Sequence, residues 1–151
     1  MLITTNDIYD SGLSVSTEIP QASVERAIKT AEQYMVRPRL TNAIYIEFAN
    51  GEHTDLFNGG IVNETEYVSG LKEAIIELTF AVLLHQSINA TTFGSVVKKD
   101  DYSDYAGYDN IADEAKRHIE IGLAYLKEIT DILGIKQEDQ VLNNFSNEEF
   151  I

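Results

Sequence analysis

The chain has 151 residues, a length typical of one domain, and no cysteine, which excludes a disulfide framework, a thiolate metal site and a cysteine nucleophile. Its 11 basic and 25 acidic residues give a formal net charge of −14, which argues against a surface that grips the phosphates of nucleic acid. Hydrophobic residues make up 44% of the chain and charged residues 24%, a balance that excludes general disorder.

Two helices separated by a proline are predicted in the first third of the chain. Pro20 suits the first turn of a helix, and apolar residues then recur at helical spacing, so we expect a helix over about residues 20–36. Pro38 is expected to end or kink this helix, because proline lacks an amide donor. A short second helix follows, and Asn50-Gly51 is expected to stop it.

A polar, glycine-rich loop is predicted over residues 51–62, and a long helix over about residues 64–89. Asn63 and Glu66 have the spacing of a capping box at the start of that helix. Apolar residues cover nearly its whole circumference: Tyr67, Leu71, Ile75, Leu78, Val82 and Leu83 form one stripe, beside Ala74, Ile76, Phe80, Ala81 and Leu84. This pattern implies burial on several sides, either in the core or against a neighbouring subunit.

Residues 91–110 differ in character from the helices around them. Phe93 to Lys98 indicate a glycine turn and a short strand, and an acidic, tyrosine-rich loop follows. A solvated loop is favoured there over a calcium site, because the carboxylates lack the spacing of an EF-hand. A final helix is expected over about residues 110–133, ended by Gly134, because apolar positions recur three or four apart: Ile111, Ala115, Ile119, Gly122, Leu126, Ile129 and Leu133.

The predicted fold class is mainly α. We expect a helical bundle built on two long antiparallel helices, with shorter helices, a small β excursion between the long helices and an extended C-terminal arm. Residues 1–135 are expected to form one domain, in which the role of residues 1–16 is unassigned. The arm, residues 136–151, carries apolar side chains that we expect to bind a partner: Val141, Leu142, Phe145, Phe150 and Ile151.

No targeting or membrane-spanning segment is predicted. The N-terminal residues lack both the basic start and the apolar run of a signal peptide. The longest apolar stretch, Ala74 to Leu84, is interrupted by Glu77 and Thr79 and is too short to cross a bilayer. We therefore expect a protein that is made in the cytoplasm.

Histidines and carboxylates are the candidates for catalytic or metal chemistry. His85 and His118 lie on the two long helices, and Glu114 precedes His118 by four residues, which places both on one helix face. Neither the Glu-x-x-His pairs of di-iron bundles nor a His-Glu-x-x-His motif is present, so structural histidines are favoured over metal ligands. Serine-nucleophile and phosphate-loop motifs are also absent. We therefore expect no enzyme and no cofactor.

Basic residues are scattered, and Arg37-Pro38-Arg39 and Lys98-Lys99 are the local clusters. Neither cluster forms a nucleic-acid footprint. Two interpretations of Arg37 and Arg39 weigh equally: they pair with acidic side chains at the corner between the first two helices, or they cross a subunit interface.

Three local patterns follow one another along the chain. From Ala31 to Leu40 an amphipathic helix ends in an aromatic residue and an Arg-Pro; Tyr67 to Lys72 opens a long apolar helix; Thr92 to Lys98 forms a glycine turn and strand. In this order and spacing they resemble the small helical head–tail connector (adaptor) proteins of tailed bacteriophages. The resemblance covers about residues 17–133.

That resemblance implies a non-catalytic subunit that assembles into a ring, usually of twelve copies, below the portal of the capsid. The ring extends the DNA channel, through which DNA passes without specific binding, and docks the next tail or connector protein. The implied partners are other copies of the chain and the portal protein, for which the arm is the candidate contact. The implied location is the virion, at the head–tail junction.

Acidic residues gather in two stretches that contain no base. Five acids lie between Arg39 and Lys72, and six lie from Asp100 to Glu114. A channel through which DNA slides should not hold phosphates strongly, and an acidic lumen meets that need. We expect one of the two stretches to face the lumen or the rim, and the candidate residues are Asp100, Asp101, Asp104 and Asp109.

Two other functions remain open at this point. An acidic helical binding or regulatory module, such as a DNA mimic or an antitoxin-like partner, would use its charge to imitate phosphate; a basic partner encoded nearby would favour it. A metal-dependent enzyme built around His85 and His118 is the third possibility, and metal analysis of the purified protein tests it.

Overall fold

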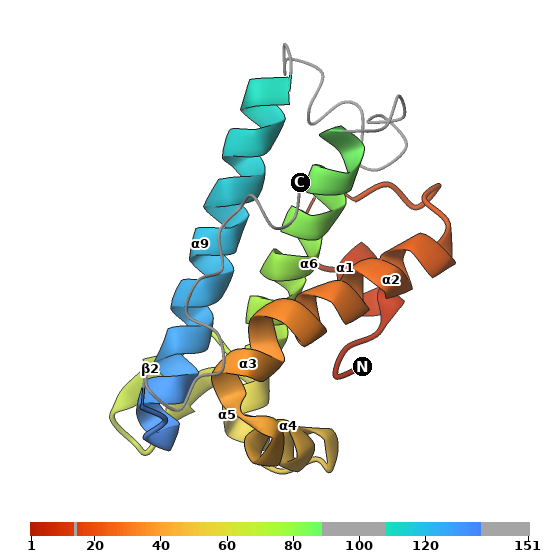
Figure 1. Ribbon diagram of the computed structural model, residues 1–151. Coiled ribbons are helices and arrows are strands. Elements are labelled where there is room, and N and C mark those ends of the chain that lie inside the picture. Colours follow the sequence, from red (N-terminus) through yellow and green to blue (C-terminus); the bar gives the residue numbers. More distant parts are fainter. Residues whose placement is uncertain (14, 89–107, 137–151) are drawn as a thin grey trace.

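The computed structural model describes residues 1–13, 15–88 and 108–136, and it is mainly helical (Figure 1). The elements in chain order are α1 (Thr5–Tyr9), α2 (Gln21–Ala31), the π-helical turn η1 (Glu32–Val36), α3 (Arg37–Leu40), α4 (Asn42–Ala49), α5 (Thr54–Asn58), β1 (Gly60–Val62), β2 (Glu66–Val68), α6 (Leu71–Ile88) and α9 (Tyr108–Leu133). None of the described helices is both long enough and apolar enough to span a membrane.

Helix α6 is the centre of the fold. It packs along α9 and also contacts α1, α2, η1 and α5, so neighbours from the same chain surround it. The apolar residues predicted around its circumference are buried, from Leu71 to Leu84. Each fully buried leucine or isoleucine contributes about 1.5–3 kcal/mol through the hydrophobic effect. The chain's own core therefore accounts for the all-round apolarity of α6.

Helix α9 confirms the predicted stripe. Ile111, Ala115, Ile119, Leu126 and Ile129 are buried on the face that meets α6. Gly122 lies where the two helices approach most closely: a Cβ added there would be 2.6 Å from Cγ of Leu78 and 3.1 Å from the carbonyl oxygen of Ala74. Glycine at this step of the stripe lets the two backbones come together.

Gly134 ends α9 as predicted. Its φ is +71°, and its amide donates to the carbonyl of Asp131 at 3.2 Å. The amide of Ile135 donates to the carbonyl of Thr130 at 2.9 Å. These two hydrogen bonds form a Schellman motif, which satisfies carbonyls that the end of a helix leaves without partners.

The prediction of a helix from residue 64 was wrong, because a hairpin precedes α6. Strands β1 and β2 pair antiparallel, with Ile61 opposite Tyr67 and Val62 opposite Glu66. Asn63 and Glu66 therefore belong to the hairpin and not to a capping box. The burial of side chains alternates along the strands, as expected for a sheet with one covered face: Val62 and Val68 are buried, whereas Ile61 and Tyr67 are exposed. Likewise, the predicted loop over residues 51–62 contains α5 and β1.

Two glycines fix the base of this hairpin. Gly59 and Gly70 have φ of +82° and +104°, in the left-handed region that favours glycine. A Cβ on Gly70 would be 2.8 Å from the amide nitrogen of Gly59, and a Cβ on Gly59 would be 2.4 Å from the carbonyl oxygen of Ser69. A helix running into residue 70 from residue 64 is incompatible with this close backbone contact.

Pro38 does not end the first helix. Helical backbone continues from α2 through η1 into α3, and the chain leaves it at Thr41, whose φ is +71°. Pro38 lies in the first turn of α3, where an amide donor is least needed. The wider π turn immediately before it relieves the crowding that a proline ring causes in a regular α-helix.

The β excursion was predicted between the two long helices. Among the described residues, the one sheet is the hairpin that precedes α6. The turn and strand predicted from Phe93 to Lys98 and the arm beyond residue 136 lie outside the described residues.

Candidate functional site

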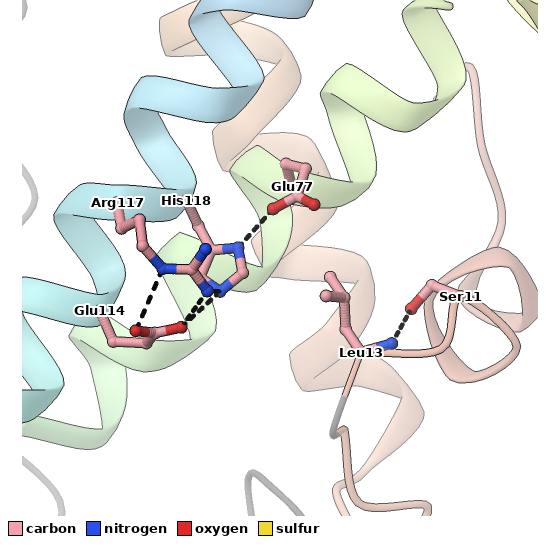
Figure 2. Close-up of polar contacts among 6 residues, drawn as sticks. All are labelled: Ser11, Leu13, Glu77, Glu114, Arg117 and His118. Carbon is pink, nitrogen blue, oxygen red and sulfur yellow. Dashed lines mark hydrogen bonds and ion pairs between the residues drawn. The ribbon is translucent and has the colours of Figure 1, made fainter. Parts of the chain in front are cut away.

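His118 lies between two glutamates where α9 meets α6 (Figure 2). Its Nδ1 bonds the carboxylate of Glu77, and its Nε2 lies 3.0 Å from Oε1 of Glu114. The edge of the ring of His118 packs on Phe80, with 4.7 Å between the ring centroids. A nitrogen of the Arg117 guanidinium lies 3.5 Å from Nε2 of His118, so three charged or polar side chains gather around this ring.

Arg117 extends this cluster to the surface. Its guanidinium donates to Oε1 of Glu114 at 2.5 Å and to Oε2 at 3.3 Å. These hydrogen bonds from Arg117 hold the pKa of the Glu114 carboxyl below its usual range. The cluster is thus a chain of four hydrogen-bonded side chains, Glu77, His118, Glu114 and Arg117, in which Glu77 comes from α6 and the rest from α9.

The two carboxylates bond opposite nitrogens of one ring, so they do not converge on a common point. Accordingly, the part of the chain that the structure describes contains no group of three histidines or carboxylates able to hold a metal ion. The spacing of four residues predicted that Glu114 and His118 share a helix face; in the structure the two side chains are also paired. The partner across the helices, Glu77, was not predicted, because it is 41 residues away in sequence.

His85 does not share this site. It lies eight residues beyond Glu77 on α6, about 12 Å along the axis at 1.5 Å per residue. The side chain is 2% exposed, and neither ring nitrogen has a hydrogen-bond partner among the described residues. Burial lowers the pKa of His85, so the ring is held in its neutral form. A metal centre that uses His85 and His118 together is therefore not supported by their placement.

The arginines predicted at the corner occupy different surroundings. The guanidinium of Arg37 lies 4.7 Å from the centroid of the Tyr45 ring and donates to Oδ1 of Asn42 at 3.3 Å, while the side chain stays exposed. Arg39 donates to the carbonyl of Met35 at 3.1 Å, and burial lowers its pKa. Both arginines thus have contacts within the chain, and Arg37 also faces outward.

A buried carboxylate at the same corner ties down the N-terminal segment. Glu32 is 3% exposed and accepts hydrogen bonds from the amide of Leu2, at 2.9 and 3.1 Å, and from the hydroxyl of Tyr45, at 2.8 Å. Burial, and then the bond to Glu32, raise the pKa of Tyr45 to about 12. This contact gives residues 1–16 a structural role, which no pattern in the sequence indicated.

Five large apolar side chains are exposed among the described residues, one of which is the N-terminal Met1. Ile61 and Tyr67, directly opposite each other in the hairpin, are 74% and 71% exposed. Tyr34 on η1 and Ile46 on α4 are 52% and 54% exposed. Exposed pairs of this kind are typical of contact surfaces, whereas single exposed apolar residues carry little information.

The first acidic stretch surrounds the hairpin. Glu52, Asp55, Glu64 and Glu66 are all exposed, on or beside α5 and the two strands. In the second stretch, Asp100, Asp101 and Asp104 lie outside the described residues, and Asp109 belongs to the first turn of α9 with its side chain outside them. The five apolar residues predicted to bind a partner through the arm also lie outside: Val141, Leu142, Phe145, Phe150 and Ile151.

A scan against protein-family models, a search of curated proteins and a search of solved structures each found no match to this chain.

Proposed function

We propose that this chain is a structural subunit without catalytic activity, the head–tail connector of a tailed bacteriophage. In this proposal, copies assemble into a ring below the portal, extend the DNA channel and dock the next tail or connector protein. DNA passes through the channel without specific binding, and the arm from residue 136 contacts the portal.

Exposed apolar side chains in the hairpin support the proposal independently of the resemblance in sequence. Among the described residues, neighbours surround α6 and α9 buries its stripe from Ile111 to Ile129, yet Ile61 and Tyr67 remain 74% and 71% exposed. Apolar side chains left in water add nothing to the stability of the fold. Their exposure favours a function that works through contact with other proteins.

The buried polar clusters support the same proposal. His118 and Glu32 are engaged by partners within the chain, and each joins segments that are far apart in sequence. Groups held in this way stabilise a fold and are poorly placed to meet a substrate. The exposed carboxylates around the hairpin suit a surface past which DNA slides, because they repel phosphate.

Negative-stain microscopy of the purified chain, alone and with the portal protein encoded in the same genome, tests the proposal. We expect rings in at least one of the two samples. Single copies in both samples would contradict the connector function and would favour the acidic regulatory module instead. The alternative of a metal-dependent enzyme is tested separately by adding zinc or manganese to the purified protein. We expect no change in its unfolding temperature.

A further inference from the structure

The hairpin presents one surface that is both apolar and acidic. Ile61 and Tyr67 are cross-strand partners, so their side chains emerge on the same face. Glu64, at the tip, is exposed as well. Glu66 is exposed but pairs with the buried Val62, so it belongs to the opposite face of the hairpin. We call Ile61, Glu64 and Tyr67 the hairpin surface. A cross-strand pair supports its own hairpin, but exposures of 74% and 71% leave most of both apolar side chains free for another contact.

The corner between α2 and α3 presents a second surface of opposite charge. Residues 26–39 contain four bases and one acid, Glu32, whose side chain is buried. Lys29 and Arg37 are exposed there, and Tyr34 between them is 52% exposed. We call these three residues the basic corner. In a chain with a net charge of −14, a locally basic surface is unusual.

A shallow hollow adjoins the basic corner. It has a volume of about 380 Å³ and is lined by Gln33, Arg37, Pro38, Thr41 and Asn42. Apolar atoms make up a large part of such a lining, because Pro38 and the stems of Gln33 and Arg37 contribute to it. The basic corner thus offers a recess for a side chain next to two positive charges.

The two surfaces rest on different parts of the molecule. The hairpin packs against α5 and α9, whereas the corner packs against α4 and α6. In Figure 1 the hairpin lies beside the C-terminal end of α9, and α2 runs toward that side, so the corner is at the end of α2 nearer the hairpin. One copy therefore displays both an acidic apolar projection and a basic recess, on different elements.

We propose that the hairpin surface of one copy docks on the basic corner of the next. The inference rests on the proposed function, because a ring of identical subunits needs a contact between two different surfaces. Ile61 and Tyr67 pack on Tyr34 and over the hollow lined by Arg37 and Pro38, and the carboxylate of Glu64 faces Lys29 and Arg37. Complementary charge sets the register of the two copies and makes their association sensitive to salt.

Two variants separate the two halves of this contact. The hairpin variant carries Glu64→Lys in the turn and Tyr67→Thr in a strand, where threonine is well suited; the corner variant carries Lys29→Glu and Tyr34→Gln, which suit a helix. All four positions are exposed, so we expect unchanged circular dichroism and thermal unfolding. Lys116→Glu, an exposed charge reversal on α9, is the matched control and should assemble like the parent chain.

Assembly is measured by sedimentation velocity and microscopy, in the condition that gives rings from the parent chain. We expect each variant alone to form no rings. An equimolar mixture of the two variants retains one intact hairpin and one intact corner, so we expect it to form dimers and nothing larger. Dimers in the mixture, together with monomers in each variant alone, would establish a contact between unlike surfaces.

Two results would overturn this contact while leaving the connector function standing: rings that persist in either variant, or a mixture that stays monomeric. A parent chain that forms no ring, alone or with the portal protein, would overturn both proposals. Salt supplies an independent check. Because salt screens the charge pairs, we expect the parent rings to dissociate as the salt concentration is raised.

Discussion

Two buried histidines of this chain have opposite surroundings. His118 is flanked by carboxylates on both sides, so its buried ring nitrogens have hydrogen-bond partners. His85 is equally buried, but neither of its nitrogens has a partner among the residues that the structure describes, and burial lowers its pKa. The ring of His118 joins two helices, whereas burying the polar ring of His85 lowers the free energy of unfolding.

The pH dependence of folding should expose His85. Because its folded pKa lies below the unfolded value of 6.5, the unfolded chain binds the proton more readily. The contribution of His85 to stability is therefore constant above about pH 6.5 and falls as the pH drops through that value. We expect His85→Leu to reduce this loss and to raise the free energy of unfolding by about 1 kcal/mol at pH 7.5. Urea unfolding at pH 7.5, 6.0 and 5.0 measures both effects; an unchanged pH profile would contradict this account.

Glu77 should contribute more to stability than an ordinary surface glutamate. Glu77→Gln replaces the carboxylate that bonds Nδ1 of His118 with a neutral amide, a weaker hydrogen-bond acceptor, so we expect the free energy of unfolding to fall by about 1–3 kcal/mol. Glu73→Gln, on an exposed turn of the same helix, is the matched control and should stay within about 0.5 kcal/mol of the parent. Urea denaturation of the two variants makes the comparison, and equal losses would rule out the special role of Glu77.

At the scale of elements, sequence spacing predicted correctly those features that depend on residues close together in the chain. The α9 stripe and its glycine stop follow from spacing alone, and so does the pairing of Glu114 with His118. The start of α6 was misplaced because Tyr67 and Leu71 continue an apparent helical stripe across a hairpin. The backbone contact of Gly59 with Gly70 forbids that helix, and no single-sequence spacing reports such a contact.

In the candidate site, too, contacts between residues far apart in the sequence could not be predicted. Bonds from Glu77 to His118 and from Leu2 to Glu32 join residues 41 and 30 positions apart, so they depend on the packed fold and not on local spacing. The exposure of Tyr67 likewise follows from its strand, because the same residue on a helix would have been assigned to the core.

The closest approach of the two long helices should tolerate no added methyl group. Gly122→Ala places its Cβ against Leu78, and overpacking of about 1–3 kcal/mol outweighs the gain of up to about 1 kcal/mol in helix propensity. We expect the free energy of unfolding to fall by about 1 kcal/mol. In a Leu78→Ala background the added methyl has room, so the same substitution should become neutral or stabilising there. Thermal unfolding of the parent, the two single variants and the double variant measures the effect. An equal loss of stability from Gly122→Ala in both backgrounds would show that the clash with Leu78 is not the cause.

At the scale of the whole molecule, charge and apolar exposure are distributed unevenly. The stretch between Arg39 and Lys72 has five acids and no base, while residues 26–39 are basic. A chain organised in this way presents surfaces of opposite sign to its neighbours, which favours a defined orientation during association. If the hairpin meets the next copy, the acids from Asp100 to Glu114 become the better candidates for the lumen or the rim.

The arm should be separable from the folded domain. Deleting residues 140–151 removes no described part of the core, so we expect unchanged circular dichroism and thermal unfolding. Because apolar anchors that order on binding would be lost, we expect the shortened chain no longer to join particles that contain portal protein. Pull-down with tagged portal measures this, with the full chain as control. Full incorporation of the shortened chain would refute the role of the arm.

The central position of α6 has a consequence for biosynthesis. The helix ends at Ile88, but its largest packing partner, α9, is complete only at Leu133. The ribosome must therefore add 45 more residues, the difference between positions 133 and 88, which takes about 2–9 s at 5–20 residues per second. During that interval one apolar side of α6 is uncovered on the nascent chain, which makes it a substrate for chaperones that hold hydrophobic segments until translation is finished.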